Sequence, residues 1–369
     1  MNMEVDLDGL FHQNDTFDYD NYEYKDDFET SAIEGVSIPV LYSVALVIGL
    51  LGNGLLLAVL AQKRRNWSIS DTFILHLSVA DLLLLGMLPF WAAQATQSGW
   101  CFGSFLCKIS GAVFNINFYC GIFLLVCISL DCYLSLVPTT QLYSQKKPRL
   151  AHISCLSVWL GCLILTIPDC VFLVAHRDHA QAKTLCVHCY SQSLIYWERV
   201  SRLLYHTLGF LLPAAALIIC CSCILLRLQR CSESLQKKRA AMVVLPLVAV
   251  FLLCWTPYNI TLIVETFRSS SKGTDNVVCS NPERSLKKAL KVTSALGCIH
   301  ACLRPLLYLG LCGNFRKRTL AMLRRATDVS KSSLWELGVG EEALPDPNQD
   351  AEELKSMTSV EHQVQSSQC

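Results

Sequence analysis

Residues 107–133, CKISGAVFNINFYCGIFLLVCISLDCY, decide the fold of this chain. They contain 22 consecutive residues without Asp, Glu, Lys or Arg, from Ile109 to Leu130. At about 1.5 Å per residue, a helix of that length measures roughly 33 Å and can cross the hydrocarbon core of a bilayer. A cysteine that can form a disulfide stands at one end, and an aspartate at the other. The stretch therefore predicts a membrane helix with one oxidising side and one cytosolic side.

The rest of the chain contains further stretches of this kind. Of its 369 residues, 52% are hydrophobic and only 17% are charged, against about 25% charged in average soluble domains. Six more spans are predicted, the last of them weak in hydropathy: residues 34–63, 71–108, 149–169, 202–227, 239–265 and 291–311. We therefore predict an all-α membrane protein, a seven-transmembrane helix bundle.

Basic clusters fix the orientation, because Lys and Arg accumulate on the cytosolic side of membrane proteins. They follow spans one, three, five and seven, at residues 63–65, 146–149, 227–239 and 316–325. All four clusters share one side only if seven spans exist. The N-terminus is then extracellular and the C-terminus cytosolic, with no secretory signal before the first span.

Four regions follow from this topology. Residues 1–36 are an acidic extracellular tail, with eleven Asp or Glu against Lys25 and so a net charge of −10. Residues 37–311 are the bundle. In residues 312–326 apolar and basic residues alternate, which predicts an amphipathic helix on the membrane lipid. Residues 327–369 are polar and acidic, as in a disordered cytoplasmic tail.

Five of the twenty cysteines fall on the outside: Cys101, Cys107, Cys186, Cys189 and Cys279. We predict a bridge between Cys107 and Cys186, with Cys189 as the alternative partner. The odd number leaves at least one cysteine unpaired or intermolecular, and the remaining pairing is open. His176, His179, Cys186, His188 and Cys189 match no standard zinc spacing, so no metal site is predicted.

Other function classes find little support. Nothing in the sequence points to a cofactor or a nucleic-acid partner. An enzyme needs catalytic groups that converge, whereas His76, His206 and His300 stand on different spans. A transporter needs a polar path or repeated halves, and neither occurs. The motif GLLGNG around Gly49 lacks the setting of a phosphate loop and fits tight helix packing.

The acidic tail points to a basic partner. Tyr19, Tyr22 and Tyr24 stand among carboxylates, the setting in which tyrosines are sulfated. Such a segment attracts a basic protein and raises its association rate more than its affinity. A merely solvating tail is the alternative. Asn14, in Asn-Asp-Thr, is a glycosylation acceptor on the extracellular side.

Several motifs resemble the rhodopsin-type receptors coupled to G proteins. These are Asn53 in GNGLLL, Asp81 in LSVADLLL, Trp159, Pro213, Cys254-Trp255-Thr256-Pro257-Tyr258 and Pro305-Leu306-Leu307-Tyr308. Within that group LPFWA, FGSFLCK, FNINFYCG and TQLY resemble the CXC chemokine receptors, and most closely those of type 3, whose ligands are interferon-inducible. The resemblance covers about residues 37–320.

The resemblance implies CXC chemokines as ligands and the plasma membrane as location. It places ligand contacts at Tyr42, Trp91, Phe114, Asp169, Tyr258 and Glu265. Asp169 and Glu265 lie near the outer membrane face and suit a cationic ligand terminus, since acids there are costly unless hydrated or paired. The four aromatic residues are as consistent with core packing.

Three departures fall among the switch residues of the family. Its Asp-Arg-Tyr motif reads Asp131-Cys132-Tyr133 here, and a cysteine lacks the charge and fork of donors with which that arginine engages the G protein. Cys221 stands where a tyrosine normally meets Tyr308. Arg304 replaces the asparagine of Asn-Pro-x-x-Tyr, and Trp255 is retained.

Arg304 predicts a salt bridge. It lies at the same depth as Asp81, and an unpaired arginine at the bilayer centre costs roughly 2.5–3.5 kcal/mol or more. The bridge would occupy, beside Asn117, the pocket that holds sodium in relatives. The alternative is that Arg304 extends inward to the headgroups.

Together the departures predict a receptor that keeps its ligand but couples weakly to Gi. We expect an atypical, scavenging receptor that internalises chemokine into endosomes and recruits arrestin through a phosphorylated tail. The alternative is a conventional Gi-coupled receptor that drives calcium signalling, leukocyte chemotaxis and the immune response.

Overall fold

The computed structural model describes residues 19–63, 67–97, 99–137, 147–178, 183–191, 195–230, 235–269, 277–279 and 284–336. Asn14, His179, the TQLY motif and the tail beyond Glu336 lie outside these residues. Residues up to Phe315 and residues from Arg316 onward form two separate compact units.

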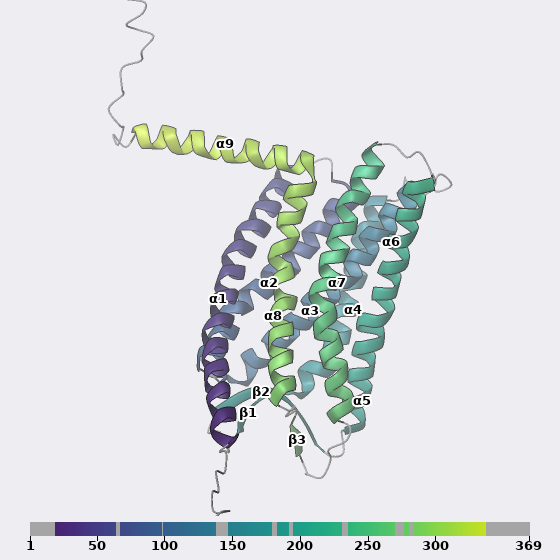
Figure 1. Cartoon of the computed structure of the whole chain (residues 1–369). Coiled ribbons are helices and arrows are strands. Elements are labelled where there is room, and N and C mark those ends of the chain that lie inside the picture. Colours follow the sequence, from purple (N-terminus) through teal and green to yellow (C-terminus); the bar gives the residue numbers. More distant parts are fainter. Residues whose placement is uncertain are drawn as a thin grey trace, which may run out of the picture. The chain divides into compact units, whose positions relative to one another are not determined.

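The first unit is built almost entirely of helices (Figure 1). They are α1 (Tyr19–Gln62), α2 (Ile69–Gln97), α3 (Gly103–Leu136), α4 (Lys147–Phe172), α5 (Ile195–Leu204), a π-helical stretch (Tyr205–Leu211), α6 (Leu212–Arg230), α7 (Leu235–Ser269) and α8 (Arg284–Leu311). α5, the π-helical stretch and α6 are continuous. Within the described residues, seven segments are long and apolar enough to cross a membrane. The predicted seven-helix bundle is therefore confirmed.

α3 is the central helix of the bundle. Its most apolar window is 61% buried, against 22% to 50% for the other six spans. It packs against α2, α4, α6 and α7. Phe118, Cys120, Ile122 and Leu124 are completely buried along it. Residues 107–133, from which we first predicted a membrane helix, therefore form the central helix around which the others pack.

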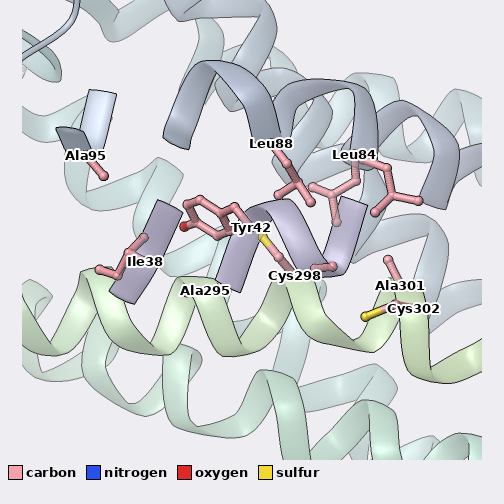
Figure 2. Close-up of a cluster of buried hydrophobic side chains, with 11 residues drawn as sticks. Ile38, Tyr42, Leu84, Leu88, Ala95, Ala295, Cys298, Ala301 and Cys302 are labelled. Carbon is pink, nitrogen blue, oxygen red and sulfur yellow. The ribbon is translucent and has the colours of Figure 1, made fainter. Parts of the chain in front are cut away.

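A second apolar cluster joins α1, α2 and α8 (Figure 2). Glycines allow this close packing, because a Cβ on Gly49 would lie 2.6 Å from Leu85 Cδ2 and one on Gly52 would lie 2.8 Å from Pro305 Cγ. The GLLGNG motif therefore serves helix packing in this structure.

Three short strands lie at the end of the bundle where α5 begins (Figure 1). β1 (Leu173–Asp178) and β2 (Lys183–Ser191) form an antiparallel hairpin, and β3 (Val277–Cys279) pairs with the far end of β2. A disulfide joins Cys107 at the start of α3 to Cys186 on β2, with the Cα atoms 5.7 Å apart. The hairpin is thereby attached to the central helix.

Two helices are longer than the predicted segments. α1 begins at Tyr19, within the acidic tail, where neither proline nor glycine interrupts the chain before Gly35. α9 (Gly313–Glu336) passes the expected end at residue 326. Hydrophobic periodicity could not place either boundary.

Candidate functional site

A cavity of about 590 Å³ lies in the half of the bundle that adjoins the β1–β2 hairpin. Its wall includes Cys186 and His188 from the hairpin. All six residues that the family resemblance nominated for ligand contact also line it: Tyr42, Trp91, Phe114, Asp169, Tyr258 and Glu265. They come from α1, α2, α3, α4 and α7, so the fold gathers at one place residues that are far apart in the sequence.

Aromatic rings form the floor of this cavity. Phe114 is central, with its ring centroid 5.8 Å from Trp91, 5.3 Å from Tyr258 and 5.2 Å from Trp255. Trp255 is fully buried and lies below Phe114. A ligand that displaces Phe114 would therefore press on Trp255.

Asp169 on α4 has two partners inside the cavity. Asn115 Nδ2 on α3 donates to Asp169 Oδ2 at 2.7 Å, and His188 Nε2 on β2 lies 2.7 Å from Asp169 Oδ1. Both carboxylate oxygens are engaged, and the side chains of Asp169 and His188 each remain 28% exposed. The acid is fixed in place yet open to a ligand.

Glu265 on α7 is paired with a cation of the chain itself. Arg202 Nη1 on α5 lies 3.2 Å from Glu265 Oε2 and 3.4 Å from Thr266 Oγ1. Both side chains of the ion pair are largely buried. Because Arg202 already neutralises Glu265, a basic ligand group that reaches this carboxylate has to compete with Arg202.

The sequence analysis assigned no ligand-site role to Arg202, His188 or Asn115. Arg202 marked the boundary of the fifth span, although a charge within a membrane-spanning segment is itself a signal for a polar pocket. His188 reaches Asp169 only because the hairpin folds over the bundle. No local pattern predicts that contact.

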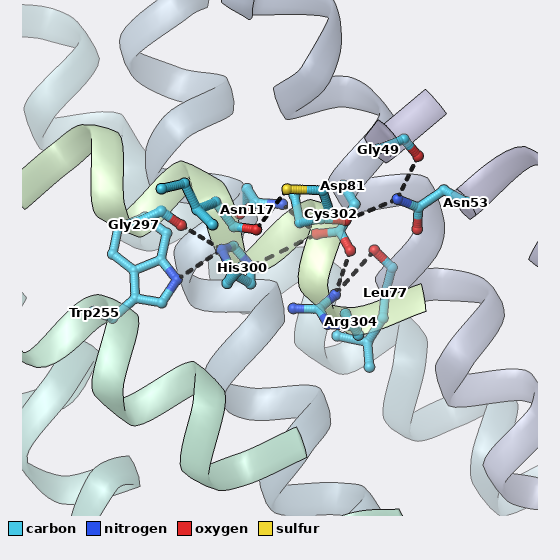
Figure 3. Close-up of polar contacts among 12 residues, drawn as sticks. Gly49, Asn53, Leu77, Asp81, Asn117, Trp255, Gly297, His300, Cys302 and Arg304 are labelled. Carbon is cyan, nitrogen blue, oxygen red and sulfur yellow. Dashed lines mark hydrogen bonds and ion pairs between the residues drawn. The ribbon is translucent and has the colours of Figure 1, made fainter. Parts of the chain in front are cut away.

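A second polar cluster lies deeper, where α2, α3 and α8 meet (Figure 3). Arg304 Nη1 donates to Asp81 Oδ2 at 2.8 Å and to the Leu77 carbonyl oxygen at 3.3 Å. Asn117 Nδ2 donates to Asp81 Oδ1 at 3.0 Å. The Asp81 side chain is fully buried and that of Arg304 is 7% exposed. In this structure Arg304 turns toward Asp81 inside the bundle.

His300 links this cluster to the cavity floor (Figure 3). Trp255 Nε1, which can only donate, donates to His300 Nδ1 at 3.2 Å, and His300 Nε2 lies 3.7 Å from Asp81 Oδ1. A continuous row of contacts thus runs from Phe114 at the cavity to Arg304.

The C-terminal part of α3 carries the Asp131-Cys132-Tyr133 motif. Cys132 is buried, and the flanking Asp131 and Tyr133 are partly exposed. Cys221 on α6 is partly buried, and both cysteines are free thiols. Tyr308 packs its ring against Phe315, with the centroids 5.1 Å apart. The two positions at which the family resemblance leads us to expect Arg and Tyr are therefore occupied by free thiols.

No group of three or more His, Cys, Asp or Glu in the described part of the chain could hold a metal ion. The cavity and the deep polar cluster are the two sites that we consider further.

Comparison with known proteins identifies the family of this chain. The family model for the 7 transmembrane receptor (rhodopsin family) matches residues 52–308. The chain is 43% identical to the C-X-C chemokine receptor type 3 of Bos taurus and 42% identical to that of Homo sapiens, each over 288 residues covering 78% of this chain and 76% of the relative. It is 35% identical to the C-X-C chemokine receptor type 1 of Homo sapiens over 308 residues, which cover 83% of this chain and 85% of the relative.

Proposed function

Because this chain belongs to the rhodopsin family of seven-transmembrane receptors, and within it to the C-X-C chemokine receptors, we propose that it binds C-X-C chemokines and removes them from the medium while coupling weakly to G proteins. The family is one of receptors in the plasma membrane and is not enzymatic. The scavenging role is the specific part of the proposal.

Ligand capture is supported by the outer half of the molecule. The cavity offers an aromatic floor and two carboxylates, of which Asp169 is more exposed than Glu265. A basic ligand terminus can reach Asp169 directly and can exchange with Arg202 at Glu265. The acidic tail adds long-range attraction, which accelerates association. Interferon-inducible chemokines are the ligands we expect, by similarity to the type 3 relatives.

Weak coupling is supported by the inner half, and the observation that carries the proposal is Cys132. At the inner end of α3, where family members present an arginine, this chain has a buried thiol. A thiol is a weak donor without charge, whereas a guanidinium offers five donors in a fixed fork. The contact to the C-terminal helix of the G protein that the family makes through this arginine has no equivalent here.

The Arg304–Asp81 pair supports the same conclusion. A movement of α8 relative to α2 either separates the buried charges of Arg304 and Asp81 or requires both to move as a pair. Separating them is costly because each would be left without a counter-charge in a low-dielectric interior. The pair therefore favours one arrangement of the bundle over others, and the weak coupling would follow from both features.

The remaining parts of the proposal come from sequence. We place the N-terminus outside the cell, with sulfation at Tyr19, Tyr22 and Tyr24 and a glycan on Asn14. The cytosolic tail holds serines and threonines whose phosphates would recruit arrestin by charge-assisted contacts. Internalised receptor would carry chemokine to endosomes.

One experiment tests the two halves of the proposal together. Cells that express the full chain are given fluorescently labelled interferon-inducible C-X-C chemokine, and uptake is recorded beside Gi dissociation. We expect rapid uptake with little dissociation. Strong Gi dissociation would refute weak coupling, and absence of uptake would refute scavenging.

A further inference from the structure

Strand β2 carries two cysteines, and the structure engages both in disulfides. Cys186 is bonded to Cys107. Cys189 is also disulfide-bonded and therefore needs a second partner. The identity of the cysteine bonded to Cys189 determines which parts of the extracellular face are covalently joined.

The strand register points to Cys279. β2 and β3 are antiparallel, and Cys189 is the Cα partner of Cys279, followed by Tyr190 opposite Val278 and Ser191 opposite Val277. Directly opposed residues in antiparallel strands have Cα atoms about 4.5–5.5 Å apart. Disulfides need roughly 4.4–6.8 Å between Cα atoms, so the backbone already holds these two positions at a suitable separation.

Elimination leads to the same residue. No cysteine precedes Cys101, so the acidic tail has none to offer. Cys101 is an exposed free thiol, and Cys170 near the outer end of α4 is also free. Of the five cysteines predicted on the outside, only Cys279 is left.

We infer that Cys189 and Cys279 form a second extracellular disulfide. In its formation the two thiols lose two protons and two electrons to the disulfide of an oxidoreductase in the secretory pathway, which is reduced to two thiols. One S–S bond forms in the receptor and one is broken in the donor.

This bond would give the extracellular face a specific arrangement. β3 lies in the connection between α7 and α8, and β2 carries His188, which contacts Asp169 in the cavity. The bond would therefore tie the α7–α8 connection to the hairpin at the residue next to His188, and through Cys186 to α3. The acidic tail has no cysteine and would take no part in this bond.

Thiol counting on intact cells tests the inference independently of chemokine binding. Full-length receptor at the cell surface is labelled with a membrane-impermeant maleimide that adds mass. We expect one label on the wild-type chain, at the exposed Cys101, and none on Cys101→Ser, because the free thiol of Cys170 is partly buried against the Lys108 carbonyl oxygen. Cys189→Ser should carry two labels, at Cys101 and at the released Cys279, and Cys279→Ser should carry two, at Cys101 and at the released Cys189. The variant with both substitutions should carry one label, at Cys101. A Cys189→Ser chain that leaves Cys279 unlabelled would overturn the inference.

A second measurement needs no variant and so does not depend on folding of the mutants. Non-reducing digestion of the purified wild-type receptor followed by mass spectrometry should yield a cross-linked pair of peptides containing Cys189 and Cys279, which separates on reduction. Linkage of Cys189 to any other cysteine, or to a second copy of the chain, would contradict the inference. Neither result bears on whether the receptor scavenges chemokine.

Discussion

Arg304 on α8 forms an ion pair with Asp81 on α2, with 2.8 Å between Nη1 and Oδ2 in the interior of the helix bundle. The two residues lie 223 positions apart in the sequence, and the carboxylate has no exposure. The guanidinium group of Arg304 therefore lies beside Asp81, whose carboxylate is the most buried among the described residues. This is the contact on which the conformational part of the account depends.

Replacing Arg304 should destabilise the receptor. Arg304→Asn leaves Asp81 buried with Asn117 as its remaining close donor, and loss of one partner of a buried pair costs about 3–5 kcal/mol. We expect the melting temperature of detergent-solubilised receptor to fall by roughly 10 °C. Arg318→Asn, the same substitution on the exposed surface of α9, is the matched control and should change little.

The double variant Asp81→Asn with Arg304→Asn makes this test specific. It leaves no unpaired buried charge, so we expect it to regain most of the lost stability, and the two effects should not add. If the losses of stability in the two single variants add in the double variant, the charges of Asp81 and Arg304 do not depend on one another.

Exchange of sodium chloride for choline chloride should leave the wild-type melting temperature unchanged, because Arg304 occupies the place of a free cation.

Restoring the side chains that the family resemblance leads us to expect at positions 132, 221 and 304 should restore coupling to Gi. Cys132→Arg returns the fork of donors at the inner end of α3, and we expect a small gain in agonist-driven Gi activation. Addition of Cys221→Tyr and Arg304→Asn should increase it further, because each change removes one obstacle. Cys132→Ala is the control and should remain as weak as wild type. If the triple variant is folded at the cell surface and binds chemokine but stays silent, the weak coupling has another cause.

Glu265 should contribute to ligand affinity. Glu265→Gln removes a charge that a basic ligand group can use, and a hydrogen bond to a charged group contributes about 1.5–3 kcal/mol. The equilibrium dissociation constant of the labelled chemokine should rise roughly ten- to hundredfold. The variant also removes one counter-charge of Arg202, so stability has to be measured in parallel.

Arg202→Gln separates these two effects. Combined with Glu265→Gln it removes both charges, and we expect stability to recover while chemokine affinity stays low. Alone, it removes the competition of Arg202 at Glu265 and should raise affinity for chemokines with a basic N-terminus. Recovery of affinity in the double variant would mean that Glu265 acts only on folding.

The tail tyrosines should govern the rate of capture. Tyr19→Phe, Tyr22→Phe and Tyr24→Phe together remove the sulfate acceptors, and we expect the chemokine association rate to fall about tenfold at low salt. The difference should shrink as salt screens the charges. Tyr196→Phe, at a tyrosine that is 72% exposed on α5, is the matched control. If the triple variant and the wild type bind chemokine at equal rates, the tail serves only to solvate the N-terminus.

The sequence predicted the bundle and part of the deep cluster for identifiable reasons. Long uncharged stretches report membrane spans directly, and an arginine and an aspartate at equal depth in an apolar medium have few other partners. The Arg202–Glu265 pair could not be predicted, because the rotation of α5 relative to α7 follows from packing and not from composition. The contact of His188 with Asp169 depends on the path of the hairpin. The ends of α1 and α9 extend into polar sequence, where hydropathy carries no signal.

The most direct test of the central claim is nucleotide exchange on purified Gi heterotrimer, with wild-type receptor in lipid nanodiscs and saturating interferon-inducible chemokine. Binding of the same chemokine is measured on the same sample. The account predicts tight binding with an exchange rate close to that of empty nanodiscs, because Cys132 offers no guanidinium to the G protein. Exchange as fast as that driven by a type 3 receptor with an intact Asp-Arg-Tyr motif would contradict it.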